Sequence, residues 1–314
     1  MTTDQVTYLI FGIVLVLAII LDLGILSRRS ATISIRKAAY QTIFWVLLAL
    51  AFGGFMWFEK GQVPALEYIS AYLMEWSLSI DNIFVFILIF SFFKIREDHI
   101  PRALLIGILM AIIFRIIFIT IGVVLVERFY WILYIFGAFL VYTGVKLFTI
   151  KQEEEFDPEK NPVYKFFNRF LPIVHDDVDG KFTVKRNGKR FYTNMFLVVV
   201  LLATTDIVFA LDSIPAVFAI SQDKLVIYTS NIFAVLGLRA LYFLLKGAVN
   251  KFIYLQQGIA IVLIFIGLKM LAEIFHFKVP IYISLMVIVI CLFGSIIYSI
   301  QNRGPVNDKE PDST

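Results

Sequence analysis

Nine apolar runs dominate this sequence, and each is close to the length that crosses a bilayer as a helix. About 20 apolar residues suffice for such a span. Because 60% of the residues are hydrophobic and only 17% are charged, the runs predict an all-α polytopic membrane protein of about nine transmembrane helices in the lipid bilayer. The runs cover residues 7–26, 38–58, 65–93, 102–126, 130–150, 193–220, 227–246, 252–274 and 279–300.

The distribution of lysine and arginine predicts the orientation of the chain. Five segments carry four, three, nine, two and two basic residues, whereas each of the other connections carries one. Basic loops stay on the cytoplasmic side, so the N-terminus is expected outside and the C-terminus inside the cell membrane. The first span lacks a basic region before it, which predicts a retained helix and no cleavage. The basic segments are 27–37, 94–102, 151–192, 246–251 and 301–314.

The long segment 151–192 divides the chain into two halves. Its Asn187-Gly188 pair lies between short β-prone runs, which predicts a β-hairpin inside a cytoplasmic loop. The expected organisation is an N-terminal two-helix segment, two three-helix units around the loop, a final helix and a polar disordered tail. These parts cover residues 1–64, 65–150, 151–192, 193–275, 276–300 and 301–314.

A short acidic pattern occurs twice, each time inside an apolar run. It consists of an acidic residue, five residues, an aspartate, then asparagine or serine, then isoleucine. A carboxylate at membrane depth is costly unless it has a partner, and such residues usually mark an ion or proton pathway. The pattern therefore predicts a buried site built from two copies: Glu75, Asp81 and Asn82 in one, and Asp206, Asp212 and Ser213 in the other.

The similarity of the two halves extends beyond these acids. Asp81 is followed by Arg115 in the next span, and Asp212 is followed by Arg239 in its next span. A repeat unit with an odd number of helices, here three, has two copies that cross the membrane in opposite directions. Many transporters have this arrangement, with a binding site between the repeats. We therefore expect an inverted repeat in which the third and sixth spans face each other antiparallel.

The spacing within the pattern limits which acids can share an ion. Six residues correspond to about 9 Å along a helix and roughly 120° around it, so Glu75 and Asp81 cannot both bind one ion from an unbroken helix. Either a helix breaks, for which Pro215 is the candidate position, or two helices supply the ligands. Asp81 and Asp212 would then meet at the centre, with Asn82 and Ser213 adding neutral oxygens.

The available ligand atoms favour a hard divalent cation. The three histidines fall in loops or at a span end, and Cys291 is the only cysteine. Carboxylate, amide and hydroxyl oxygens suit Mn²⁺, Mg²⁺ or Ca²⁺. The candidate metal ligands are Asp81, Asp212, Glu75, Asp206, Asn82 and Ser213, with supporting charges on Arg115, Arg239 and Asp22. No tightly bound cofactor, nucleic-acid partner or catalytic residue is expected, and no nucleotide-binding P-loop is present.

Structural roles compete with these assignments. Arg115 and Arg239 are always charged and could hold two of the acids in ion pairs that never contact substrate. Asp22, near the end of its span, suits helix packing better than ion binding. Lys146 and Lys269 lie near helix ends, where a long side chain is expected to snorkel to the membrane surface.

Four blocks of the sequence resemble the TerC/Alx family of bacterial membrane proteins. They are the two acidic blocks, Leu236-Gly-Leu-Arg239-Ala-Leu-Tyr-Phe and Tyr134-Ile-Phe-Gly-Ala-Phe-Leu. The resemblance covers nearly the whole chain except the polar tail. It implies a place in the LysE-like transporter superfamily and an association with tellurium resistance, manganese export and metallation of secreted enzymes.

Residues and resemblance together predict an inner-membrane transporter that exports Mn²⁺, with proton antiport as a compatible coupling, and no enzymatic activity. Three alternatives stay open. A non-transporting scaffold would recruit secretion or stress-response proteins in the metal or tellurium response. An intramembrane aspartyl protease would use Asp206 and Asp212, although its usual sequence settings are missing. An exporter of small amino acids would need a site for an ammonium group and a carboxylate.

Overall fold

The computed structural model describes residues 7, 9–17, 20, 34–149, 162–174, 180–186, 188–246, 254–277 and 279–301, without the side chains of 81, 149, 162, 163, 212 and 300. Helices account for most of this chain, which confirms the all-α class. The helices are α2 (Ile35–Lys60), α3 (Gln62–Phe92), α4 (Ile100–Arg128), α5 (Ile132–Thr149), α6 (Pro162–Phe170), α7 (Asn194–Ile220), α8 (Lys224–Leu236), α9 (Leu238–Lys246), α10 (Leu255–Ala272), the 3₁₀ turn η3 (Glu273–Phe275) and α11 (Ile281–Gln301).

Six of the described helices are long and apolar enough to cross a membrane: α2, α3, α4, α7, α10 and α11. A seventh span results if α8 and α9, which meet at 41°, count as one bent span. Helix α5 is apolar but shorter, and the described residues of the expected first span, 7, 9–17 and 20, are helical. Large apolar side chains such as Leu47, Val124 and Ile290 are exposed on the outside of the bundle, as lipid contact requires. The count of nine spans stays a prediction.

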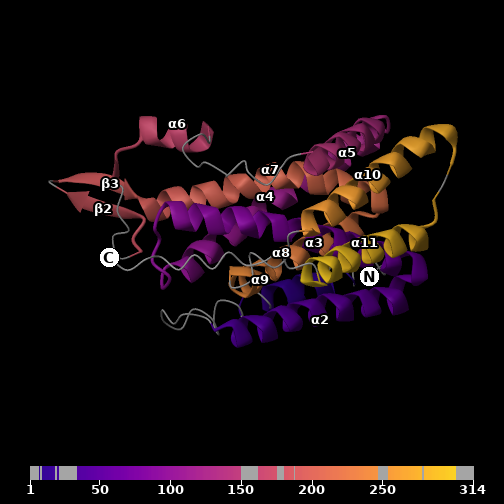
Figure 1. Ribbon diagram of the computed structural model, residues 1–314, viewed down its shortest axis with the longest axis horizontal. Coiled ribbons are helices and arrows are strands. Elements are labelled where there is room, and N and C mark those ends of the chain that lie inside the picture. The colour runs from indigo at the N-terminus through magenta and orange to yellow at the C-terminus, as the bar shows by residue number, and fades with distance from the viewer. Residues whose placement is uncertain are drawn as a thin grey trace.

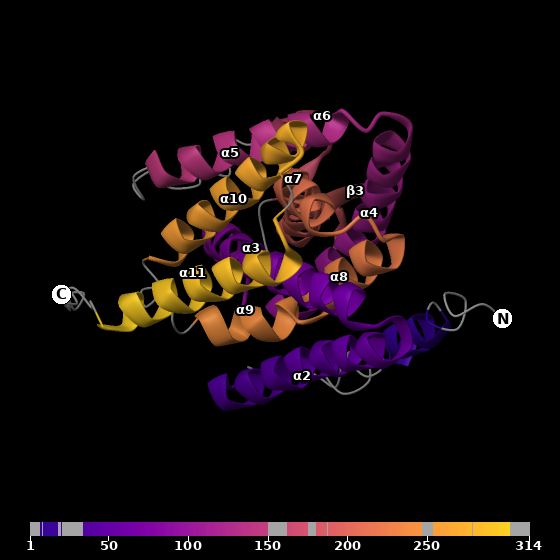
Figure 2. The ribbon, with the colours of Figure 1, turned by 90° about the vertical axis from the view of Figure 1, so that its right-hand side faces the viewer.

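Helices α3 and α7 lie inside the bundle and run antiparallel, as expected (Figures 1 and 2). The Asn194 side chain at the start of α7 donates to the carbonyl of Phe93, directly after α3. At the other end, Ser221 directly after α7 donates to Glu67 in the second turn of α3. The two helices that carry the acidic patterns therefore pack against each other along their length.

The directions of the neighbouring helices are those that an inverted repeat would have. A Cβ atom on Gly107 would contact Leu202, and one on Gly122 would contact Phe218, so α4 and α7 are parallel. Helices α3 and α8 are parallel as well, because Lys60 pairs with Asp223 and, farther along, Tyr68 packs on Phe233. Helices α5 and α10 pack closely at glycines (Figure 2). The repeat and the domain boundaries stay predictions.

The segment before α7 forms a small sheet at the end of the bundle where α3 finishes (Figure 1). Strands β2 (Thr183–Arg186) and β3 (Lys189–Thr193) pair antiparallel, which confirms the predicted hairpin. Strand β1 (Ile173–Val174) adds to β3 in parallel, and α6 precedes it. Neither was predicted, although the apolar and basic residues of α6 alternate as in an amphipathic helix.

Contacts at this end bring several basic segments together. Lys246 at the end of α9 pairs with Glu97, and Arg102 at the start of α4 donates to the carbonyl of Gly180. Within the described chain, parts of the segments 94–102, 151–192 and 246–251 therefore share one end of the bundle. Which end faces the cytoplasm stays a prediction.

The expectation that a helix breaks at Pro215 is wrong. Helix α7 continues from Asn194 to Ile220 with Pro215 inside it, because a helix surrounded by other helices can tolerate the loss of one backbone hydrogen bond. The break occurs instead at Gly237, between α8 and α9. The sequence predicts one continuous span at residues 227–246.

Candidate functional site

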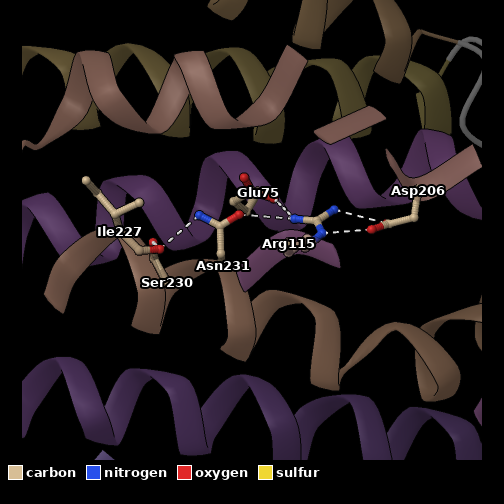
Figure 3. A network of polar contacts seen from close by, with 6 residues as sticks. All are labelled: Glu75, Arg115, Asp206, Ile227, Ser230 and Asn231. Atoms are coloured by element: carbon tan, nitrogen blue, oxygen red, sulfur yellow. Dashed lines mark hydrogen bonds and ion pairs between the residues drawn. The ribbon is translucent and has the colours of Figure 1, made fainter. Parts of the chain in front are cut away.

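A buried arginine joins the two acidic patterns at the centre of the bundle (Figure 3). Arg115 of α4 donates from Nε and Nη2 to the two carboxylate oxygens of Asp206, at 2.9 and 3.1 Å. Its Nη1 donates to Glu75. Because Glu75 and Asp206 lie on α3 and α7, one cation ties three helices together.

Burying three charged side chains costs free energy unless each of them has a partner. Arg115, Glu75 and Asp206 are all at most 2% exposed, and each lies near the middle of its helix. A guanidinium holds a carboxylate best through two parallel hydrogen bonds, and Asp206 has this geometry. One positive and two negative groups leave the cluster with a formal charge of −1, so it favours a further positive charge nearby.

Asn231 completes the cluster and was not predicted. Its side-chain oxygen accepts a hydrogen bond from Nη1 of Arg115 at 3.2 Å, and its amide nitrogen donates to the carbonyl of Ile227 at 2.9 Å. Asn231 is fully buried, so the second bond fixes which way its amide points (Figure 3). The polar run Thr229-Ser230-Asn231 inside an apolar span is the signal that could have identified it.

Several oxygens along α3 and α7 are buried without a hydrogen-bond partner among the described residues. One belongs to Asn194 at the start of α7, and the others belong to the carboxylate of Glu75 and to four neutral side chains: Ser79, Asn82, Thr205 and Ser213. Asn82 and Ser213 are two of the neutral ligands expected from the sequence, whereas Ser79 and Thr205 were missed. Buried oxygens normally have partners, so a row of unsatisfied acceptors inside a membrane bundle is unusual. Such oxygens fit the shell of a hard cation.

The structure describes the other predicted site residues only in part. The backbones of Asp81 and Asp212 belong to α3 and α7, but their side chains lie outside the described part of the structure, as does all of Asp22. Arg239 is buried as the second residue of α9, directly after the bend. Within the described residues, no group of three or more acidic, histidine or cysteine side chains could hold a metal ion.

The ion pairing considered for the arginines is confirmed for Arg115, which pairs with Glu75 and Asp206. The cluster is also asymmetric, because a single arginine lies between two acids that the predicted repeat would relate to each other. Glu75 and Asp206 are thus fixed in place, and Glu75 still keeps one oxygen without a hydrogen bond.

The prediction that Lys269 snorkels to the membrane surface is wrong. Its side chain is buried, with 8% of the residue exposed, and its ammonium donates to the carbonyl of Ala219 on α7 at 3.2 Å. Lys146, its counterpart in the first half, is exposed as expected.

Sequence comparison places this architecture in a known family. The sequence model of the "Integral membrane protein TerC family" matches residues 60–305. The chain belongs to the TerC family. The match begins just before α3 and includes both acidic patterns, Arg115, Asn231 and Arg239.

Relatives align over almost their whole length. An uncharacterized membrane protein of Myxococcus xanthus is 42% identical over 292 residues, which cover 92% of this chain and 91% of the relative. A protein of Escherichia coli K12 named "Putative membrane-bound redox modulator Alx" is 39% identical over 288 residues, covering 88% and 89%. No solved structure matches the chain. This TerC protein is therefore a multi-pass membrane protein with bacterial relatives.

Proposed function

We propose that this protein is a divalent-metal transporter of the bacterial inner membrane and that it exports Mn²⁺. The observation that carries the proposal is the row of buried oxygens without partners along α3 and α7, beside a cluster with a formal charge of −1. A purely structural polar cluster would satisfy its oxygens internally. An oxygen-rich, negative site at bilayer depth suits a cation that passes through it.

The proposal gives different roles to the acids paired with Arg115 and to the two other aspartates. Arg115 fixes Glu75 and Asp206, which makes them a rigid negative wall. Asp81 and Asp212 are the proposed principal ligands, because the residues after them, Asn82 and Ser213, bury oxygens without hydrogen bonds. The free oxygen of Glu75 is the one atom of the wall that can reach an ion directly.

Proton antiport follows from the chemistry of such a site. Carboxylates that release a cation in a desolvated place become more basic and take up protons. Asp81 and Asp212 would then carry protons inward after the ion has left. Arg115 keeps Glu75 and Asp206 in ion pairs, so the proposal assigns proton transfer to Asp81 and Asp212.

The test is metal flux into inside-out proteoliposomes loaded with a Mn²⁺ indicator. Wild type should accumulate Mn²⁺ under a proton gradient, and Asp81→Asn and Asp212→Asn should each abolish uptake while leaving the melting temperature in detergent unchanged. Asp98→Asn, which changes a loop carboxylate paired with Arg96, is the matched control and should transport normally. Equal flux in wild type, both variants and empty vesicles would refute transport.

A further inference from the structure

A cavity of about 510 Å³ opens at the end of the bundle opposite the sheet. It lies between the start of α3, the end of α7, the end of α10 and the start of α11, and its lining includes Glu67, Ser221, Lys269 and Glu273. A smaller cavity of about 230 Å³ beside it shares Tyr130, Phe218 and Gln222. The charge pattern of the loops predicts that this end faces the outside of the cell.

Two carboxylates and one ammonium line the larger cavity: Glu67, Glu273 and Lys269. Neighbouring charges at the rim already have partners. Lys60 pairs with Asp223 at 3.4 Å, and Lys224 pairs with Glu127 at 2.7 Å. The charges on the described residues that line the cavity therefore amount to −1, which attracts cations.

Lys269 lines the same cavity as these two acids without an ion pair to either of them. Its charge interacts with both Glu273 and Glu67, but its hydrogen bond goes to the backbone carbonyl of Ala219. An ammonium beside two carboxylates supplies a positive charge that can move without leaving the protein.

The oxygens around Lys269 are oriented by neighbouring groups. Ser221 donates to Glu67 at 2.6 Å, and Tyr130 donates to Glu273 at 3.3 Å. Partial burial and the charge of Glu273 raise the pKa of Tyr130, so its hydroxyl remains a donor at neutral pH. The carboxyl ends of α7 and α10, which carry the negative ends of the helix dipoles, also face this region.

The cavity and the central site both border α3. Glu67 precedes Glu75 by eight residues of α3, which is about 12 Å along the helix. The repeat relates Glu67 to Val198, a buried apolar residue, and Lys269 to the exposed Lys146. The two halves of the molecule therefore differ where an ion would leave the bundle.

We propose that this cavity is an outer vestibule that binds a hydrated divalent cation, and that the ion displaces the ammonium of Lys269 from Glu67 and Glu273. The choice of ion rests on the proposed transport function. An octahedral shell of about six waters, at about 30 Å³ each, fits within the cavity. The vestibule accepts the ion after the central site has released it, and the return of Lys269 pushes the ion out.

The experiment uses Mn²⁺ alone as the probe and a spin label beside the cavity. Val63 lines the vestibule and is exposed, so Val63→Cys in a Cys291→Ser background places a label there. Bound Mn²⁺ should broaden the label's spectrum saturably, and a label at Lys185→Cys on the sheet should not respond in the same way. Glu67→Gln and Glu273→Gln should each raise the half-saturating concentration by about tenfold or more.

Lys269→Met gives the result that a simple acidic patch would not predict. Removing the competing ammonium should lower the half-saturating concentration about tenfold. Absence of saturable broadening at position 63, or broadening that is unaffected by the Glu67→Gln/Glu273→Gln double variant, would overturn the vestibule. Displacement of Mn²⁺ by glycine but not by Mg²⁺ would assign the cavity to a zwitterion and overturn the cation assignment.

These results separate the vestibule from the transport site. Flux that depends on Asp81 and Asp212, without any Mn²⁺ signal at position 63, would overturn the vestibule and keep the proposed function. Saturable broadening that depends on Glu67 and Glu273, in a protein without flux, would support the cation site and refute transport.

Discussion

Arg115 holds Asp206 through two parallel hydrogen bonds, from Nε and Nη2 to the two carboxylate oxygens. The third donor of the same guanidinium reaches Glu75 on the antiparallel helix. The two related acids are therefore joined by one permanent cation. These hydrogen bonds hold α3, α4 and α7 together at the centre of the bundle.

Arg115→Met should destabilise the protein strongly. It removes the partner of two fully buried carboxylates, and breaking a buried ion pair from one side typically costs about 3–5 kcal/mol. The melting temperature in detergent should fall by many degrees, whereas Arg128→Met, at the exposed end of α4, should change it little. Adding Glu75→Gln and Asp206→Asn to Arg115→Met should recover part of the loss. No recovery would show that Arg115 stabilises the bundle through packing and not through charge.

Much of the fold follows from hydrophobicity and the repeated pattern. The all-α membrane class, the antiparallel packing of α3 on α7 and the hairpin at Gly188 are predicted correctly because they depend on local sequence and on symmetry. The helix break is misplaced because Pro215 is an obvious helix breaker and Gly237 is not. Only the packing of the neighbouring helices decides which of the two positions bends.

The candidate site shows where reasoning from one sequence ends. Spacing identifies Glu75, Asp206 and Arg115 as related buried charges, but not that a single arginine serves both acids. Asn231 and Ser79 are uncharged and carry no spacing signal, so their place beside the cluster depends on helix rotation.

Ser79→Ala should separate ion binding from structural packing. The Ser79 hydroxyl is buried without a hydrogen-bond partner in the described chain, so its removal costs no bond and should leave the melting temperature unchanged or slightly higher. If the hydroxyl belongs to the ion shell, the Mn²⁺ concentration for half-maximal flux should rise several-fold. Ser77→Ala is the matched control, because Ser77 lies on the same helix and donates to the carbonyl of Leu73. Unchanged flux in Ser79→Ala would remove this residue from the site.

Gly267→Ala should weaken the contact between α5 and α10. A Cβ atom at this position would lie 2.6 Å from the carbonyl oxygen of Gly137 and 2.9 Å from the backbone nitrogen of Val141. Because backbone atoms cannot move aside, we expect a loss of about 1–3 kcal/mol, as for other overpacked contacts. Gly294→Ala on α11 meets nothing within 4 Å and should be neutral or stabilising. Thermal unfolding in detergent measures both, and equal melting temperatures would refute the close approach.

Gly237→Ala should alter transport without unfolding the protein. Gly237 has φ −78° and ψ −13°, which alanine adopts freely, and a Cβ atom there would lie 3.5 Å from that of Trp45. Alanine favours a continuous helix by about 1 kcal/mol over glycine, so the substitution opposes the 41° bend between α8 and α9.

Straightening the helix should displace Arg239, which lies two residues after Gly237. Broken helices commonly shape the binding sites of transporters, so a straighter helix should misplace this buried guanidinium and lower Mn²⁺ flux several-fold at an unchanged melting temperature. Gly54→Ala on α2, where a Cβ atom meets nothing within 4 Å, should leave both quantities unchanged. If the bend positions Arg239 for transport, a substitution that straightens the helix must change Mn²⁺ flux. Full flux in Gly237→Ala would therefore show that the bend only accommodates helix packing.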